Sequence, residues 1–185
     1  MSILKVNTIQ DKGGNTIISS DGSGTLTLGN DALKASPMFY AYLSSSQTIS
    51  SNYGNHKVLF DTEVFDTDNC YDNTTNYRFT PTVAGKYFIF ASVNFDSSSN
   101  SQLETAYLRV YKNGSKLSEI DNTFSNNLLR RVQVNINEIV DMNGTTDYIE
   151  IYGAFVDSDT GTAPVFKGSS TNRSSKFGAY RIIGA

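Results

Sequence analysis

The sequence predicts an all-β protein whose antiparallel strands form a two-sheet sandwich. Short runs of Val, Ile, Thr, Tyr and Phe recur between Gly, Asn, Asp and Ser residues, a pattern typical of strands joined by turns. No window of helical length carries an apolar stripe. The Asn-Gly pairs at 113–114 and 143–144 each separate two such runs and predict two hairpins, because a type I′ turn needs two residues with positive φ.

Eight or more strands are expected after residue 37, which is enough for a sandwich. In chain order they are expected at 39–43, 58–65, 76–80, 85–95, 107–111, 117–120, 127–139, 147–155 and 176–183. The segment 127–139 shows the clearest period of two, since Val132, Val134 and Ile136 alternate with polar residues. One face of this strand is therefore expected to be buried and the other exposed.

Residues 1–36 differ from the rest of the chain. Weakly alternating snippets such as 4–9 and 25–28 are separated by Gly, Ser and Asn, and they contain too few apolar residues to bury a core alone. We interpret 1–36 as an arm that is ordered by a partner or by copies of itself, and 37–185 as a head domain. The alternative is a frayed N-terminus.

Composition excludes several classes of protein. The chain has 15 basic and 18 acidic side chains, a net charge of −3 and no basic block, so no nucleic-acid partner is expected. One Cys cannot form an internal disulfide. No apolar run has the length of a membrane span, and residues 1–5 lack the apolar core of a signal peptide, so neither membrane insertion nor a signal peptide is expected.

Several short motifs in the head occur in the order found in a known family. They are Phe60-Asp61, Phe65-Asp66, Asn69, Tyr71-Asp72, Arg78-Phe79-Thr80-Pro81, Gly85-Lys86-Tyr87-Phe88, Lys112-Asn113-Gly114 and Phe177-Gly178-Ala179-Tyr180. Residues 38–185 thereby resemble the globular head of complement component one-q and the related tumour-necrosis-factor-like jelly rolls. The resemblance implies an antiparallel jelly roll that assembles as a homotrimer.

A second resemblance lies in the arm. The segment 4–11, Leu-Lys-Val-Asn-Thr-Ile-Gln-Asp, followed by a Ser-, Gly- and Thr-rich stretch, resembles the opening of many phage tail-fibre and other virion proteins. This resemblance implies a virion component, made in the host cytoplasm, whose residues 1–36 contact other virion proteins. Leu4, Val6 and Ile9 are the attachment residues that it suggests.

A trimer needs an interface, and tyrosine suits one because its ring buries area while its hydroxyl keeps a partner. In 147–155, Tyr148 and Tyr152 fall on the face opposite Ile149 and Ile151. Tyr180 and Ile182 alternate in the same way near the end of the chain. We expect Tyr148, Tyr152, Tyr180 and Ile182 to lie near the trimer axis. The alternative is an ordinary strand with solvent-exposed tyrosines.

The residues that carry catalysis in most enzymes are scarce. His56 is the only histidine, and neither a Gly-x-Ser-x-Gly nor a His-Glu-x-x-His motif occurs. Cys70 has acidic neighbours, which disfavour a thiolate, so we expect a small buried or loop residue. No enzymatic activity and no organic cofactor are expected.

Asp66, Asp68, Asn69 and Asp72 form a cluster of oxygen ligands that makes calcium a weak hypothesis. The calcium-loop pattern would need an oxygen ligand and a Gly where Cys70 and Tyr71 stand. The alternative is a solvated loop with Asx turns, in which Asp and Asn bond their own backbone. Tyrosines 42, 53 and 71 are candidates for stacking on a sugar ring, and polar loops between strands are the usual place for recognition.

Together these observations favour a non-enzymatic phage virion protein: a trimeric fibre or knob that is anchored by its arm and aids attachment to a host-surface glycan or protein. A capsid decoration protein of the same build is the first alternative. A secreted cellular lectin or ligand of the head family is the second, although the collagen-like Gly-x-y repeat of such proteins is missing.

Overall fold

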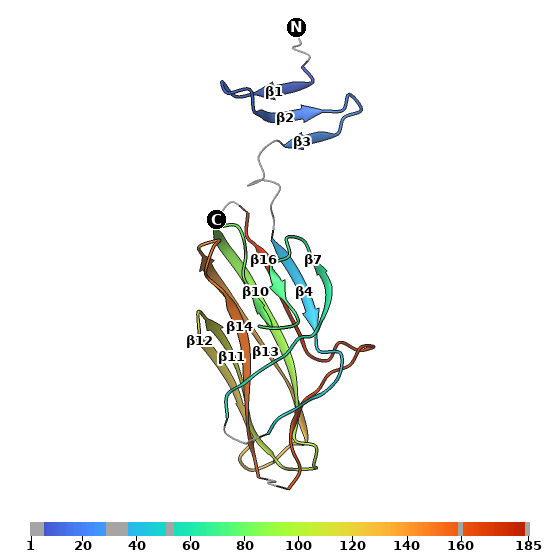
Figure 1. The fold of residues 1–185 in the computed structure, drawn as a ribbon. Helices are drawn as coiled ribbons and strands as arrows, with labels where there is room; N and C mark the ends of the chain where they lie inside the picture. Colours follow the sequence, from blue (N-terminus) through green and yellow to red (C-terminus); the bar gives the residue numbers. More distant parts are fainter. Residues whose placement is uncertain (1–5, 29–36, 51–53, 159–160, 184–185) are drawn as a thin grey trace. The chain divides into compact units, whose positions relative to one another are not determined.

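The computed structural model describes residues 6–28, 37–50, 54–158 and 161–183. Within them, all regular secondary structure is β (Figure 1). The chain divides into two compact units, Met1–Ser36 and Pro37–Ala185, and each is described here by itself. We call the first unit the arm and the second the head.

The arm is a three-stranded antiparallel meander in the order β1-β2-β3. Its strands are β1 (Thr8–Gln10), β2 (Thr16–Ser20) and β3 (Leu26–Leu28). An aspartate closes each turn: Asp11 Oδ1 accepts the Gly13 N–H at 2.8 Å, and Asp21 Oδ1 accepts the Ser23 N–H at 2.8 Å. The Asn15 side chain, which donates to the Asp11 carboxylate, lowers the pKa of Asp11, and the Ser23 hydroxyl lowers that of Asp21 to about 2, so both stay charged at neutral pH.

The head is a sandwich of two antiparallel sheets. Sheet I has the order β5-β15-β10-β16-β4-β7, and β13 pairs with β10. Its strands are β4 (Met38–Tyr42), β5 (Gln47–Thr48), β7 (Thr62–Asp66), β10 (Gly85–Asp96), β13 (Arg131–Met142), β15 (Val165–Phe166) and β16 (Lys176–Arg181).

Sheet II has the order β12-β11-β14-β9-β8, and β6 also pairs with β14. Its strands are β6 (His56–Lys57), β8 (Tyr71–Asp72), β9 (Arg78–Phe79), β11 (Leu103–Lys112), β12 (Ser115–Thr123) and β14 (Ile149–Asp157). The all-β antiparallel sandwich that the sequence predicts is therefore confirmed.

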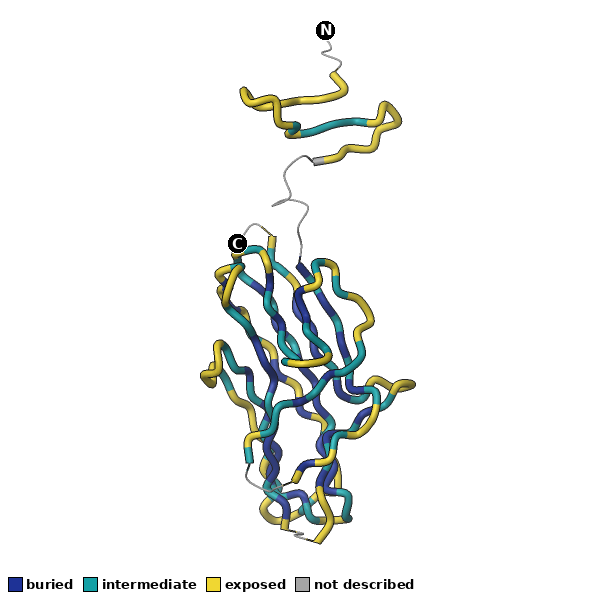
Figure 2. Tube along the Cα trace, viewed as in Figure 1, coloured by how far each residue is buried: buried dark blue, intermediate teal, exposed yellow. Residues whose placement is uncertain are grey.

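Aromatic rings fill the space between the two sheets, where the tube in Figure 2 is dark blue. Phe177 is fully buried and meets Phe39, Tyr71 and Phe60 with ring centroids 4.8, 5.8 and 5.6 Å apart. A second group forms near the other end of β10, where Phe95 stands edge-on to Phe155 at 5.0 Å. Such pairs add stability beyond their buried area.

The alternation expected for 127–139 is confirmed from Arg131 onward, where β13 begins, and the strand extends to Met142. Val134 and Ile136 are buried, Val132 is half-buried, and the polar residues between them are exposed. The Asn113-Gly114 hairpin is also confirmed: φ is 52° and 76° at these residues, as a type I′ turn requires, and β11 pairs with β12 on either side.

The second expected hairpin, at Asn143-Gly144, is wrong. The flanking strands β13 and β14 belong to different sheets, so this segment crosses from sheet I to sheet II. Asn143 Oδ1 accepts the backbone N–H groups of Thr145, Thr146 and Asp147 at 2.9–3.0 Å, which builds a longer loop. Glycine is needed at 144 because φ is 70° and a Cβ would lie 2.3 Å from the Ala84 nitrogen.

Candidate functional site

The outward face of sheet I carries a patch of large apolar side chains that we call the aromatic face. It consists of Tyr40, Phe65, Phe88, Phe90, Ile139 and Tyr180. Strand register sets them side by side: Tyr40 lies opposite Phe65, and Phe88 lies between Tyr180 on one side and Ile139 on the other. The patch therefore crosses five neighbouring strands, from β7 to β13.

The rings of the aromatic face contact one another across the strands. Centroid separations are 6.3 Å for Tyr40–Phe65, 6.3 Å for Tyr40–Phe90 and 5.3 Å for Phe88–Tyr180. Gly178 lets the Phe90 ring lie flat on the sheet, since a Cβ there would meet Phe90 Cζ at 2.3 Å. Yet Ile139 is 61% exposed and Tyr180 and Phe65 are each 46% exposed. A contiguous apolar patch of this kind on one protomer indicates an interaction surface.

The structure does not bring the four expected interface residues together. Tyr180 belongs to the aromatic face, and Ile182 follows β16 with its N–H donated to the Lys86 carbonyl. Tyr148 and Tyr152 stand on the outward side of sheet II, on the far side of the sandwich. One three-fold axis cannot pass beside both outward faces, so the four do not form one patch. That any of these four residues lies in a trimer interface stays a prediction.

The sheet II tyrosines already have partners within the protomer. The Tyr152 ring lies tilted against that of Tyr111 at a centroid distance of 4.5 Å, and its hydroxyl donates to the buried Glu150. The other oxygen of Glu150 pairs with Lys57 Nζ at 2.6 Å. Burial and the Glu150 charge raise the pKa of Tyr152 to about 12. The Arg78 guanidinium covers the Tyr148 ring at 4.5 Å.

Sequence reasoning missed most of the aromatic face, although a signal was present. In the run Tyr87-Phe88-Ile89-Phe90, both alternating sets are apolar. Tyr87 and Ile89 are buried in the core, so Phe88 and Phe90 must point outward. A strand with one solvated face would carry polar residues there, and their replacement by phenylalanine indicates a second covered face.

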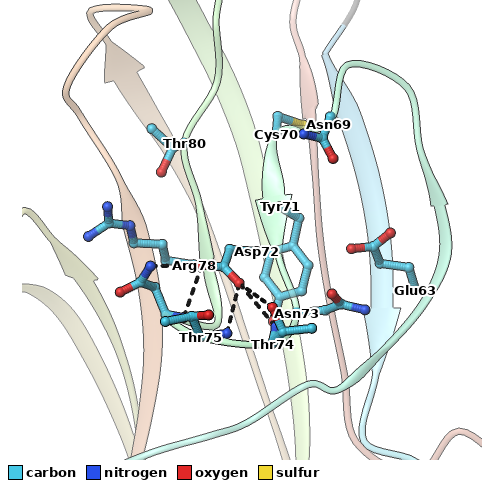
Figure 3. A pocket seen from close by; sticks show the side chains of 11 residues that line it. Glu63, Asn69, Cys70, Tyr71, Asp72, Asn73, Thr74, Thr75, Arg78 and Thr80 are labelled. Carbon is cyan, nitrogen blue, oxygen red and sulfur yellow. Dashed lines mark hydrogen bonds between the residues drawn. The ribbon is translucent and has the colours of Figure 1, made fainter.

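A polar hollow of about 610 Å³ lies beside β7, β8 and β9, at the edge of the sandwich that these strands form. Figure 3 shows Glu63 of β7 on one side, Arg78 of β9 on the other, and the loop 72–76 below. Asp72 rigidifies that loop because its carboxylate accepts the N–H groups of Thr74, Thr75 and Asn76 at 2.9–3.0 Å.

Two of the carboxylates proposed as calcium ligands, Asp66 and Asp72, instead accept hydrogen bonds from nearby backbone N–H groups. Asp66 accepts the N–H groups of Cys70 and Tyr71 at 3.0 and 2.8 Å, and Asp72 caps its loop as described. Asp68 and Asn69 lie between them, with Asn69 at a φ of 50°. This is the Asx-turn arrangement that the alternative predicts. Among the described residues, no three acidic, His or Cys side chains gather as a metal-binding group, and calcium stays a prediction.

The hollow offers both donors and acceptors to a ligand. Glu63 and Arg78 face it from opposite sides, and burial together with the charges of Asp66 and Asp72 raises the pKa of Glu63. The prediction that Tyr71 stacks on a sugar ring is wrong, because Tyr71 is buried and donates its hydroxyl to the Phe60 carbonyl at 3.0 Å. Tyr42 is half-buried under the Arg173 guanidinium, 5.3 Å from its ring, and Tyr53 lies outside the described residues.

We expect acid to destabilise the head partly through Asp72. The backbone N–H of Thr75, with those of Thr74 and Asn76, holds the pKa of Asp72 below its ordinary value of 3.8. The unfolded chain therefore binds a proton first, and stability present above that value is lost as pH falls through the folded pKa. Urea unfolding between about pH 5 and pH 2 should show a shallower decline for Asp72→Asn than for the unchanged chain. Equal slopes would contradict the assignment.

Cys70 is buried, as expected, and donates its thiol to Asp66 Oδ1 at 3.1 Å. Burial first, and then Asp66, raise the pKa of the thiol far above its ordinary value. An aromatic disulfide reagent should therefore leave the folded chain unlabelled at pH 8 and label one thiol in denaturant. Rapid labelling of the folded chain would show that the site opens. His56 lies in β6, opposite Gly153 of β14.

The arm residues expected to contact a particle are partly described. Val6 and Ile9 are about half exposed, and Leu4 lies outside the described residues. Within the described part of the chain, no helix has the length and apolarity needed to span a membrane.

No protein-family model matches the chain, and no curated protein sequence matches it. Solved structures do. The globular domain of the zebrafish complement 1qA protein is 15% identical, with a TM-score of 0.57 over 80% of this chain and 98% of that one. Murine APRIL is 9% identical, with a TM-score of 0.57 over 80% of this chain and all of that one. The Eiger TNF of S. frugiperda is 9% identical, with a TM-score of 0.53 over 81% of this chain and 93% of that one. The head of this chain thus has the jelly-roll fold shared by complement one-q globular domains and tumour-necrosis-factor-like proteins.

Proposed function

We propose that this chain is a non-enzymatic structural protein whose heads assemble as a homotrimer through the aromatic face. The carrying observation is the exposed apolar patch around Phe88, Ile139 and Tyr180 on one side of sheet I. Three copies that bury the part of this patch around Phe88, Ile139 and Tyr180 at a shared axis remove it from water. The polar hollow beside β8 and β9 is then left open to a ligand.

Light scattering of the purified full chain tests the trimer. The expected mass is three times that of one 20.3 kDa chain. A monomer at micromolar concentration overturns the proposed assembly, and a dimer overturns the three-fold symmetry.

We place the trimer on a phage particle, as a fibre or knob anchored by residues 1–36. The resemblance of residues 4–11 to the opening of virion proteins supports this, and so does the exposed Val6 of the arm. The second candidate is a capsid decoration protein, and a secreted lectin or ligand is the third. Immunogold labelling of intact particles separates them: label at the tail supports the fibre, label on the shell supports decoration, and unlabelled particles contradict both.

Attachment to a host surface would use the polar hollow, and a polyhydroxylated ligand fits its lining of amides, hydroxyls, Glu63 and Arg78. A glycan array probed with the trimer tests this idea. Binding that is lost in Arg78→Ala and kept in Tyr107→Ala, a matched change on the same sheet, supports the hollow. Silence across the array contradicts sugar recognition.

A further inference from the structure

We propose that the arm is a second three-fold assembly module, in which three copies of its sheet pack their apolar faces together. The inference rests on the proposed trimer of the head. It names two further copies of this chain as the partners that cover the arm.

One face of the arm sheet is apolar and uncovered. Register places Ile9 of β1 opposite Ile18 of β2, and Leu26 of β3 opposite Ser20, two residues beyond Ile18, so these three apolar residues share a face. Ile9 is 47% exposed and Leu26 is 68% exposed. They line a shallow hollow of about 140 Å³. We call this surface the arm's apolar face.

The opposite face is suited to water. It carries a register row of hydroxyl side chains, Thr8, Ser19 and Thr27, and Ile17 is the one large apolar residue that the described strands place beside them. The arm sheet is therefore amphipathic, yet none of its residues from 6 to 27 is buried (Figure 2). Three strands of this length need a covered apolar face to be stable.

Charge does not oppose contact between copies. From residue 6 to residue 27 the charged side chains are Asp11, Lys12 and Asp21. All three lie in or beside the two turns, and both aspartates are held there by hydrogen bonds to the turn backbone. The arm's apolar face thus carries no charge that identical copies would bring together.

The head makes copies of the same chain the favoured partner. Eight residues separate β3 from Pro37, so even a fully extended connection reaches no farther than about 30 Å. A trimeric head therefore holds three arms at an effective concentration on the order of millimolar. At that concentration weak apolar contacts between the arms suffice, whereas a separate protein would have to bind from dilute solution.

Cysteine cross-linking of the full chain tests the inference. Ile9→Cys puts a thiol on the arm's apolar face, and Thr27→Cys puts one on the opposite face as a matched control. The buried native Cys70 does not compete. With a short bis-maleimide, Ile9→Cys should give covalently linked chains and Thr27→Cys should give few. Equal linking of both variants shows only collision of tethered arms and overturns the inference, as does linking of neither.

Light scattering of the same samples separates this inference from the proposed head trimer. Trimers whose arms do not link overturn only the arm module, whereas monomers overturn the head trimer as well. Hydrogen exchange gives a second measurement: in Ile9→Ser/Leu26→Ser, the β2 amides should exchange roughly tenfold faster or more while head amides are unchanged. Unchanged exchange in β2 contradicts packed arms.

Discussion

Replacing Phe177 by Ala is expected to lower the free energy of unfolding of the head by about 3–5 kcal/mol. Phe177 is fully buried on β16, and its ring meets Phe39, Phe60 and Tyr71, so its loss leaves a cavity that the two sheets cannot close. Urea unfolding followed by tyrosine fluorescence measures the change, since the chain has no Trp.

Leu117→Ala is the control for this prediction. Leu117 is 48% exposed on β12, and truncating it should change the free energy of unfolding by less than about 1 kcal/mol. A Phe177→Ala effect as small as that of Leu117→Ala would mean that the ring cluster is not the centre of the core.

The substitution Phe88→Glu is expected to convert the trimer into folded monomers. Phe88 lies at the centre of the aromatic face between Tyr180 and Ile139, so three copies would place three charges in an apolar interface. The mass measured by light scattering should fall to one third at micromolar concentration. Far-ultraviolet circular dichroism should show that the strands persist.

Two further variants keep this prediction decisive if Phe88→Glu fails to fold. Ile139→Glu adds the same charge at a side chain that is already mostly exposed, so it should dissociate the trimer with little effect on the fold. Tyr107→Glu adds the charge on the outward face of sheet II, beside Arg109, and should leave the trimer intact. Dissociation by Tyr107→Glu alone would place the interface on sheet II.

Local patterns predicted the strands well because each strand reports its own environment. The alternation predicted for 127–139 and the Asn113-Gly114 turn depend only on neighbouring residues, and the structure shows the turn and, from Arg131 onward, the alternation. Asn143-Gly144 shows the limit of this reasoning. The same Asn-Gly pair here lies in a crossover between the two sheets, because β13 pairs with the distant β10 and not with the strand that follows it.

The candidate surfaces were harder to predict, since they depend on which strands become neighbours. Tyr148 and Tyr180 look equivalent in sequence, each alternating with core residues, yet they lie on opposite sides of the sandwich. Tyr71 looked available for stacking, but pairing of β8 with β9 turns its ring into the core. The alternation of residues along one strand does not show which strands become its neighbours or which side of the sandwich its outward face covers.

The position of β4 gives the head a mechanical property. A pull on the arm reaches the head at Pro37, directly before β4, and β4 is an internal strand held by β16 on one side and β7 on the other. Force directed along β4 loads both hydrogen-bond ladders in shear, so they must break together instead of one bond at a time. A load on the arm would therefore be resisted first at β4, by both ladders together.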